Sequence, residues 1–259
     1  MKKNILFIGY GDLGSRLASI SKDDLVITGI SRSLKPRIVP DQYHSLDWFK
    51  NSAQKVDLLK NYDCLIITLT PTSFDEAGYE KGYEEGMKLI SKLVKNISFK
   101  KSLLISSTRV YRDTEEPINE LSNVNSEDFR AKSLLESEAI YSNEINSSQK
   151  TIFRLSGLYD PEMKDKIFYK QVDEFQNKLI PISSNLNRLS RDQAARIIMN
   201  FCINKTDLLL LNVSEPTVLA QERFKMLFPE KNFDDFFRID NPGKQLDISN
   251  LLKSKLLDG

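Results

Sequence analysis

The sequence predicts an α/β fold in which a doubly wound parallel sheet carries a small C-terminal cap. Short apolar runs alternate with segments of helical periodicity through the first two-thirds of the chain. Several of these runs are continuously apolar, as expected for strands that are covered on both faces. Strand–helix–strand alternation predicts parallel strands joined by right-handed crossovers, with helices on both sides of the sheet.

The expected strands are short apolar segments, and the expected helices lie between them. The strands are predicted at Asn4–Ile8, Leu25–Ile30, Tyr43–Ser45, Cys64–Leu69, Leu103–Ser106 and Thr151–Leu155. The helices are predicted at Leu13–Ser21, Gly78–Lys95 and Ser126–Ile145. Apolar residues in Gly86–Val94 recur at spacings of three and four, so one face of that helix packs on the sheet. The Pro36–Pro40 segment is predicted to be a loop.

The pattern changes after Leu155, where turn-like sequence begins. The segments expected there are a helix at Asp165–Lys178, an irregular stretch at Pro181–Leu189, a helix at Arg191–Ile203, a strand at Leu208–Val213, and short helices and loops from Pro216. The sequence contains no internal repeat, low-complexity tract or disordered linker. We therefore expect residues 1–259 to form one domain, with its core at 1–160 plus 208–213 and its cap mainly at 161–205 and 214–259.

The charge balance excludes several classes of partner. The 259 residues include 37 Lys and Arg and 36 Asp and Glu, a formal net charge of +1. This balance provides no electrostatic reason to expect nucleic acid or an anionic membrane as a partner. No apolar run reaches bilayer length and the N-terminus lacks a secretory signal, so we expect a cytoplasmic protein. Cys64 and Cys202 lie in apolar sequence and are expected to be buried thiols, and a single histidine, His44, predicts no metal site.

The first strand leads directly into a glycine-rich turn of the form G-x-G-x-x-G. Gly9 permits a tight turn after the strand, Gly11 lets backbone approach a pyrophosphate, and Gly14 allows close packing of the following helix. The phosphates would meet free N–H groups at the helix N-terminus. The turn therefore predicts a dinucleotide site that includes Gly9, Gly11, Asp12, Leu13 and Gly14, against the alternative of an ordinary strand–helix turn.

The end of the second strand predicts the choice of cofactor. A carboxylate there favours NAD, whereas an arginine pairs with the 2′-phosphate of NADP. Ser31, Arg32 and Ser33 supply two hydroxyls and a guanidinium, so NADP is predicted over NAD. The alternative is a solvated turn. Asp47, after the third strand, either accepts a hydrogen bond from the adenine amino group or caps the following segment.

Several motifs in collinear order resemble the short-chain dehydrogenase/reductase superfamily, and most of all its extended or atypical NAD(P)-dependent epimerase/dehydratase branch. The segments that carry the resemblance are the glycine turn, Asp63–Ile67, Leu104–Tyr111 (similar to "SSxxVYG"), Phe153–Tyr159 (similar to "lRxxGxYGP"), Arg191–Arg196 and Gly243–Asn250. The resemblance implies a Rossmann sheet with a substrate-binding cap. It also places Thr68 and Leu69, at the end of the fourth strand, among the cofactor-binding residues.

Members of this superfamily use a Ser or Thr, a Tyr and a Lys to exchange a proton while hydride moves at the nicotinamide. The resemblance places Ser107 at the hydroxyl position, with Thr108 beside it. The Y-x-x-x-K pattern falls on Phe129 and Ser133, and a shift by one residue gives Lys132 but puts Asp128 at the tyrosine. Because phenylalanine has no exchangeable proton, proton transfer through this motif is not expected.

Three interpretations follow from the missing tyrosine. The chain is an oxidoreductase or a sugar-nucleotide-type epimerase/dehydratase-like protein that uses another acid, such as Lys132, Asp128 or Tyr111. Alternatively it is a non-catalytic NADP-binding sensor or scaffold, or the substrate or water relays the proton. A weaker alternative is an interaction protein whose glycine turn is vestigial. Family members often dimerise through helices, so a homodimer is a further alternative.

The substrate is expected to be a small polar molecule. Arg109 and Arg112 stand where the family often has small residues, and two cations beside a substrate cavity can hold a carboxylate or phosphate. The alternative is that they pair with the acidic residues that follow, Asp113, Glu115 and Glu116.

Overall fold

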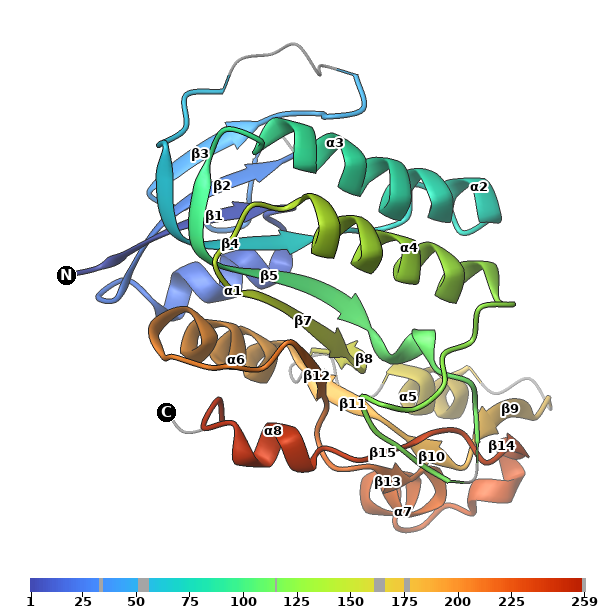
Figure 1. Ribbon diagram of the computed structural model, residues 1–259. Helices are drawn as coiled ribbons and strands as arrows, with labels where there is room; N and C mark the ends of the chain where they lie inside the picture. Colours follow the sequence, from blue (N-terminus) through green and yellow to red (C-terminus); the bar gives the residue numbers. More distant parts are fainter. Residues whose placement is uncertain (33–34, 51–55, 115, 161–165, 175–177, 258–259) are drawn as a thin grey trace.

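A parallel sheet of seven strands forms the centre of the computed structural model, which describes residues 1–32, 35–50, 56–114, 116–160, 166–174 and 178–257 (Figure 1). The strand order is β12-β7-β5-β4-β1-β2-β3. The strands are β1 (Lys3–Ile8), β2 (Leu25–Ser31), β3 (Gln42–Ser45), β4 (Asn61–Thr68), β5 (Ser98–Ser107), β7 (Lys150–Leu155) and β12 (Leu210–Val213). Each neighbouring pair is parallel, which confirms the predicted doubly wound α/β fold.

The direction of winding reverses between β1 and β4. From β1 the chain first builds outward through β2 and β3, then returns to pair β4 on the other side of β1. The loops that leave β1 and β4 therefore diverge to opposite faces of the sheet. Ligands of open α/β sheets bind in the crevice that such a reversal leaves at the carboxyl ends of the strands.

Both faces of the sheet are buried, because alternate residues of each central strand enter different apolar clusters. Ile5 and Phe7 of β1 pack toward α1 (Asp12–Ile20) and α6 (Arg191–Ile203), whereas Leu6 and Ile8 pack toward α3 (Gly86–Leu93) and α4 (Phe129–Glu144). Figure 1 shows these two helical layers on opposite sides of the sheet. This arrangement explains why the strands have no polar face in the sequence.

The long helix predicted after β4 is divided into three segments. It consists of α2 (Glu76–Tyr79), a π-helical turn η1 (Glu80–Glu85) and α3. Asp75 caps its start by accepting a hydrogen bond from the backbone N–H of Gly78 at 2.8 Å. In α4, Asp128 accepts from the N–H of Arg130 at 2.9 Å and so fixes the first helical residue at Phe129. The predicted start at Ser126 is therefore too early.

The cap is organised around a cluster of aromatic residues. Phe168 of α5 (Lys166–Asp173), Phe224 of α7 (Ala220–Leu227) and Phe237 of β14 (Phe237–Asn241) are buried against one another, with ring centroids 5.2 to 5.7 Å apart. The cluster is separate from the two sheet clusters. The cap therefore has its own apolar core and lies beside the carboxyl edge of the sheet (Figure 1).

The prediction of an irregular stretch at Pro181–Leu189 is wrong, and so is that of a tail made only of helices and loops. The short strands there are β9 (Ile180–Ser183), β10 (Asn185–Leu186), β11 (Arg188–Ser190), β13 (Val218–Leu219), β14 and β15 (Gln245–Leu246). Their partners are distant in sequence: β9 pairs β14, β11 pairs β8 (Gly157–Tyr159), and β15 pairs β6 (Pro117–Ile118). Strands this short have no periodicity of their own, so their pairing depends on the folded structure.

Helix α6 lies with the sheet and not in the cap, although it falls within the 161–205 range expected for cap elements. Its residues Ile197 and Phe201 are buried in the same cluster as Phe7 and Leu17. Leu251 of α8 (Ser249–Lys253), from the 214–259 range, joins that cluster as well. These apolar faces complete one side of the sheet, so the sequence passes from core to cap more than once.

Within the part of the chain that the structure describes, no helix has the length and apolar character needed to cross a bilayer.

Candidate active site

Four strand ends meet at the carboxyl edge of the sheet and border a cavity. Gly9 follows β1, Thr68 ends β4, Ser107 ends β5, and Ser156 follows β7. The cavity has a volume of about 460 Å³. It is lined by these four residues together with Gly11, Asp12, Leu13, Leu69, Thr70, Tyr83, Ile105, Ser106, Leu134, Leu155, Gly157, Leu158 and Arg191. We call it the first cavity.

The glycine turn has the geometry that a dinucleotide requires. Gly9 has a φ of +81°, and a Cβ there would stand 2.0 Å from the carbonyl oxygen of Thr68. The Thr68 hydroxyl donates to the Gly9 carbonyl at 2.7 Å, which holds the ends of β4 and β1 together. A Cβ on Gly14 would approach the Tyr10 ring to 2.6 Å, whereas one on Gly11 would meet only the Gly9 carbonyl, at 3.7 Å. Space therefore remains open at Gly11, on the cavity side of the turn.

The N-terminus of α1 faces the first cavity. Gly11 is the N-cap residue, and no side chain of the described residues caps this helix end. The first N–H groups of an α-helix lack partners within the helix, and the helix dipole favours an anion beside them. Gly11, Asp12 and Leu13 all line the cavity. The turn thus offers a phosphate-binding helix end.

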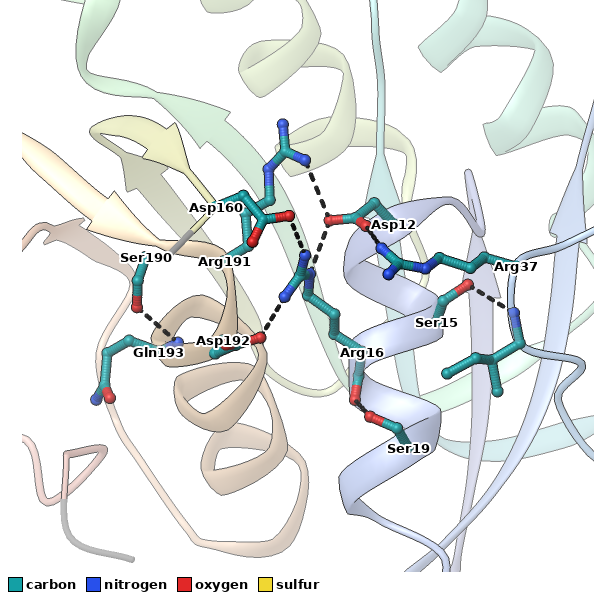
Figure 2. Close-up of polar contacts among 11 residues, drawn as sticks. Asp12, Ser15, Arg16, Ser19, Arg37, Asp160, Ser190, Arg191, Asp192 and Gln193 are labelled. Carbon is teal, nitrogen blue, oxygen red and sulfur yellow. Dashed lines mark hydrogen bonds and ion pairs between the residues drawn. The ribbon is translucent and has the colours of Figure 1, made fainter. Parts of the chain in front are cut away.

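Asp12 is surrounded by three arginines in the structure (Figure 2). Its carboxylate lies 2.9 Å from Arg16, 3.4 Å from Arg37 and 3.6 Å from Arg191. Arg191 and Asp12 both line the first cavity. A carboxylate at this helix end would repel a phosphate, but these guanidinium groups offset its charge.

Arg16 connects this cluster to α6 and to the segment after β8 through ion pairs. Besides Asp12, its guanidinium pairs with Asp160, at 2.8 Å, and with Asp192 (Figure 2). These carboxylates come from the segment after β8 and from α6. The desolvation of Arg16 lowers its pKa, but the hydrogen bonds and charges of Asp12 and Asp192 outweigh it, so the pKa of Arg16 is raised. One partly buried cation therefore joins α1, α6 and the chain that enters the cap.

Of the three residues at the end of β2 that were predicted to bind the 2′-phosphate, the structure leaves only some in a position to do so. The Ser31 hydroxyl is buried and hydrogen bonded to the Tyr43 hydroxyl at 2.6 Å, so the structure engages it elsewhere and not with a phosphate. Arg32 is exposed, and its guanidinium lies 5.6 Å and 5.5 Å from the ring centres of Trp48 and Phe49. Ser33 lies outside the described residues.

Asp47 has the capping role that was one of its two predicted alternatives. Its Oδ1 accepts a hydrogen bond from the Phe49 backbone N–H at 3.2 Å, and its other oxygen lies 3.7 Å from the Lys50 ammonium. A contact with the adenine amino group stays a prediction.

A second cavity lies between the sheet edge and the cap, with a volume of about 530 Å³. Residues 181–183 and 185–188 of the cap, Gly243 and Lys244 line one side, and residues 107–109, 111–113, 125 and 128 line the other. Ser107 and Gly157 border both cavities. The two cavities therefore meet at the end of β5, beside the hydroxyl that the resemblance assigns to catalysis.

Cations outnumber carboxylates in the wall of the second cavity. Its basic residues are Arg109, Arg112, Arg188 and Lys244, and its acidic residues are Asp113 and Asp128. Lys244 pairs with Asp113 at 2.9 Å, and Arg112 pairs with Glu127 at 3.0 Å in a solvent-exposed contact. The guanidinium groups of Arg109 and Arg188 form no ion pair with another described residue. The predicted alternative of pairing with the following acids thus holds for neither arginine among these residues, and Glu115 lies outside them.

The arginine at position 188 is placed where the cavities join. β11 pairs with β8 so that Arg188 stands opposite Gly157. A Cβ on Gly157 would stand 2.9 Å from a terminal nitrogen of Arg188, so the guanidinium lies directly over this glycine. A positive charge is therefore held at the junction, on the cap side of it.

Helix α4, where the family resemblance expects the tyrosine and the lysine, has Phe129 and Ser133 at those positions. The rings of Phe129 and Tyr79 pack edge to face, and the Ser133 hydroxyl donates to the Phe129 carbonyl at 2.9 Å within the helix. Lys132, the predicted substitute, is exposed and lines neither of the two cavities. Asp128 caps its own helix. The structure thus leaves α4 without the acid that the family pattern requires.

Tyr111 lines the second cavity, but its hydroxyl belongs to a buried network. The hydroxyl donates to Asn212 Oδ1 at 2.9 Å and accepts from Arg154 at 2.9 Å, and the residue is 2% exposed. Burial is the largest cause that raises the pKa of Tyr111, although Arg154 partly opposes it. Because both hydrogen-bonding directions are in use, the structure corrects the assignment of Tyr111 as a catalytic acid to a structural role.

Three residues of the site were not identified from the sequence. Tyr83, Ser156 and Arg188 border the cavities. Tyr83 is four residues from both Tyr79 and Met87 in a helical segment and so resembles a core residue, and Ser156 belongs to a turn. Arg188 lies in the stretch expected to be irregular. Ser156 lies within the Phe153–Tyr159 motif, which could have pointed to it, whereas Tyr83 and Arg188 belong to no motif and are brought to the site only by the folded chain.

No protein-family model and no curated protein sequence matches this chain. Solved structures do. One is a provisionally assigned NAD-dependent epimerase/dehydratase from Methylobacillus flagellatus, with a TM-score of 0.71 at 23% identity over 98% of this chain and 92% of that one. Another is UDP-glucuronic acid 4-epimerase from Bacillus cereus with a fluorinated UDP-glucuronic acid and NAD. Its TM-score is 0.73 at 16% identity, over 97% of this chain and 92% of that one.

A third is UDP-N-acetylglucosamine 4-epimerase from Methanobrevibacter ruminantium M1 in complex with UDP-N-acetylmuramic acid. Its TM-score is 0.73 at 17% identity, over 98% of this chain and 92% of that one. All three likenesses extend over the sheet and the cap together. The chain therefore has the Rossmann-like fold of these three structures, which confirms the fold class predicted from the sequence.

Proposed function

We propose that the protein is an NAD(P)-dependent oxidoreductase or epimerase that acts on an anionic sugar nucleotide or a similar small polar substrate. The observation that carries this proposal is the meeting of the two cavities at Ser107 and Gly157. One cavity ends in a glycine turn and a helix N-terminus, and the other is lined with cations. A cofactor in the first and a substrate in the second would meet at a strand-end hydroxyl.

The first cavity fits the nicotinamide cofactor by two independent features. Its glycine turn leaves open space at Gly11, where a pyrophosphate requires it. At the other end, the buried Ser156 hydroxyl has no hydrogen-bond partner among the described residues. A buried hydroxyl without a partner is costly, and a ligand carboxamide would satisfy it. When bound, the nicotinamide would supply or accept a hydride.

Ser107 is the residue proposed to orient the reacting substrate oxygen. It ends β5, and its hydroxyl oxygen accepts from the backbone N–H of Arg109 at 3.2 Å. That bond leaves the hydroxyl proton available for a substrate oxygen at the junction of the cavities. Thr108, next to it, lines the second cavity and stays a candidate for a supporting contact.

The anionic character of the substrate is proposed from Arg109 and Arg188. Arginine is suited to carboxylate and phosphate groups because its fork of N–H donors matches two oxygens at once. The Bacillus cereus and Methanobrevibacter ruminantium structures with this fold hold UDP-linked ligands, which are also anionic. A nucleotide diphosphate or a sugar carboxylate would satisfy the two guanidinium groups.

The choice between NADP and NAD rests on Arg32. Its guanidinium is exposed, packs over aromatic rings and is not neutralised by a carboxylate of the described residues. We keep the prediction that a 2′-phosphate binds there, although the Bacillus cereus structure of the same fold contains NAD. The hydroxyl of Ser31 does not contribute.

The proposal is tested first by cofactor binding and then by turnover. We expect saturable binding of NADPH and NADH to the purified protein, measured by the enhancement of reduced-nicotinamide fluorescence. We then expect conversion of at least one member of a panel of UDP-sugars and UDP-uronic acids, followed by chromatography of the products and by nicotinamide absorbance. Absence of binding to any nicotinamide nucleotide would refute the proposal.

A non-catalytic sensor or scaffold is the second candidate, because Phe129 and Ser133 occupy the places of the tyrosine and lysine. In that case the cofactor binds, but no member of the panel is converted, and Ser107→Ala changes nothing beyond binding. Turnover that Ser107→Ala abolishes excludes the sensor.

A further inference from the structure

Tyr83 places a phenol in the wall of the first cavity. It belongs to η1, on the helix that follows β4, and it lines the cavity together with Ser107, Thr68 and Gly9. Its hydroxyl forms no hydrogen bond with another described residue. The hydroxyls of Tyr10, Tyr43, Tyr111 and Tyr141 are all bonded within the protein. The Tyr79 hydroxyl also forms no hydrogen bond with another described residue, but Tyr79 lines neither cavity.

Close packing of the helix holds Tyr83 at this place. A Cβ on the preceding residue, Gly82, would stand 2.4 Å from the Thr70 carbonyl oxygen and 2.5 Å from Pro71 Cα, so the helix lies directly on the loop after β4. On its other side Tyr83 packs against the cluster that includes Val110 and Leu134. Backbone contacts at Gly82 and side-chain packing therefore together fix the position of Tyr83.

Tyr83 lies within the π-helical turn. A π turn widens the helix by one residue, which rotates the side chains beyond it relative to an uninterrupted α-helix. Turns of this kind are frequent at functional sites. Here the turn covers Glu80–Glu85 and contains Tyr83 near its middle.

Tyr79 connects Tyr83 to Phe129, which stands where the family resemblance expects the tyrosine. The Tyr79 ring lies 5.6 Å from Tyr83 and 5.5 Å from Phe129, centroid to centroid. The three rings thus form a continuous aromatic group that connects α4 to the helix after β4. Only one member of the group, Tyr83, lines the first cavity.

We propose that the Tyr83 hydroxyl takes the place of the absent tyrosine of α4 as the group that exchanges a proton with the substrate oxygen beside Ser107. This inference rests on the proposed function, because it requires a nicotinamide cofactor in the first cavity. It replaces the three acids considered from the sequence, Lys132, Asp128 and Tyr111.

The proton transfer balances in both directions. In reduction, a carbonyl carbon of the substrate gains a hydride, the electron pair of its C=O π bond moves to oxygen, and the Tyr83 O–H bond breaks to deliver a proton to that oxygen. Tyr83 is left as a phenolate, which water reprotonates. In oxidation, the phenolate removes the hydroxyl proton of the substrate as the C–H bond breaks and its electron pair leaves as hydride.

The surroundings of Tyr83 are consistent with an acid that is protonated at neutral pH. Burial is the largest cause that raises the pKa of Tyr83; together with a smaller rise from Tyr79 and a lowering by Arg109 it brings the pKa to about 12. Arg109 lies two residues after Ser107 and has no ion-pair partner among the described residues. Its positive charge would stabilise the phenolate formed in the reaction.

The experiment is a pH titration of tyrosine ionisation, which requires no known substrate. The near-ultraviolet absorbance of phenolate is followed in the protein alone, with saturating NAD⁺ and with saturating NADH, for wild type, Tyr83→Phe and the matched control Tyr79→Phe. The positive ring of NAD⁺ should lower the pKa of Tyr83 by about 1 pH unit or more, and neutral NADH should lower it less. The shift is expected in wild type and in Tyr79→Phe and absent from Tyr83→Phe.

A second measurement keeps the proposal testable if Tyr83→Phe does not fold. 3-Fluorotyrosine at position 83 keeps the hydroxyl, and its ¹⁹F signal reports the ionisation of that residue alone. A fluorine signal whose titration is unchanged by NAD⁺, in protein shown by calorimetry to bind NAD⁺, overturns the assignment of Tyr83 while the proposed function stands. Failure of calorimetry to detect any nicotinamide nucleotide overturns both.

Discussion

The rings of Tyr79 and Phe129 pack edge to face, with the ring centroids 5.5 Å apart and the planes at 90°. Edge-to-face contacts of this kind contribute about 0.5–1.5 kcal/mol beyond the burial of the rings. Phe129 therefore has a packing role at the position where the family resemblance places a catalytic phenol. The proposed phenol for proton transfer is instead Tyr83 in η1, while the cofactor is proposed to bind at the glycine turn before α1.

Substitution of the first two glycines should separate folding from cofactor binding. In Gly9→Ala, the φ of +81° and the Cβ 2.0 Å from the Thr68 carbonyl both oppose the native turn. We expect a loss of about 2 kcal/mol or more in the free energy of unfolding. In Gly11→Ala the new Cβ has room, so stability should stay close to that of wild type while the pyrophosphate is blocked.

Thermal denaturation and cofactor titration of the two variants check this expectation. Gly11→Ala serves as the control for folding, because it should lose NAD(P)H affinity with little change in Tm. Equal affinity of Gly11→Ala and wild type for the cofactor would show that the pyrophosphate does not lie at this turn.

Removal of the Ser107 hydroxyl should abolish turnover and leave cofactor binding nearly unchanged. A single donor to the reacting oxygen commonly contributes about 10²–10³-fold to kcat. Ser107→Ala is compared with Ser19→Ala, an exposed serine of α1 whose hydroxyl bonds only to its own helix. A substrate converted at the same rate by Ser107→Ala and by wild type would exclude Ser107 from the chemistry.

Arg32 should determine the preference between the two cofactors. In Arg32→Gln the exposed charge that faces a 2′-phosphate is lost, and the affinity for NADPH should fall about 10-fold, as expected for one charge-assisted contact. The affinity for NADH should change much less. Isothermal titration of both nucleotides measures the ratio. If wild type binds NADH more tightly than NADPH, the prediction of NADP is wrong whatever the variant does.

The buried pair of Arg154 and Glu138 bonds to Tyr111 and Ser106, which line the cavities, and should contribute strongly to the stability of the protein. The two side chains are 6% and 8% exposed and form two contacts, at 2.6 and 3.0 Å. Removal of one partner leaves a buried charge, so Arg154→Met or Glu138→Leu should each lower the free energy of unfolding by about 3–5 kcal/mol.

A double-mutant cycle measures how strongly the pair is coupled. The double variant Arg154→Met, Glu138→Leu should be more stable than the sum of the single losses predicts, by about 1 kcal/mol or more. Urea unfolding at neutral pH provides all four values. Additive losses would mean that the pair is not coupled, and that Tyr111 and Ser106, which also bond to it, account for the single effects.

The sheet was predictable from the sequence because its strands are buried on both faces. Runs such as Cys64–Ile67 are continuously apolar for that reason, and the glycine turn marks where the first strand ends. Ser107 was predictable as well, since it ends a strand inside a recognisable motif. These features depend on local sequence, which is available before folding.

The cap and part of the site could not be predicted, because they depend on pairings between distant segments. Arg188 reaches the junction of the cavities only through the pairing of β11 with β8. Tyr83 enters the first cavity through a π-helical turn, and no periodicity in the sequence distinguishes that turn from an α-helix. The Ser31 hydroxyl is hydrogen bonded to Tyr43 of the neighbouring strand, and this contact arises only when the two strands pair.

A crystal structure of the protein soaked with NADP⁺ or NAD⁺ tests the central claim most directly. The account predicts a dinucleotide in the first cavity, with its pyrophosphate at Gly11 and the N-terminus of α1, and its nicotinamide beside Ser156, Ser107 and the Tyr83 hydroxyl. A nucleotide bound elsewhere, or a nicotinamide turned away from Ser107 toward solvent, would contradict it.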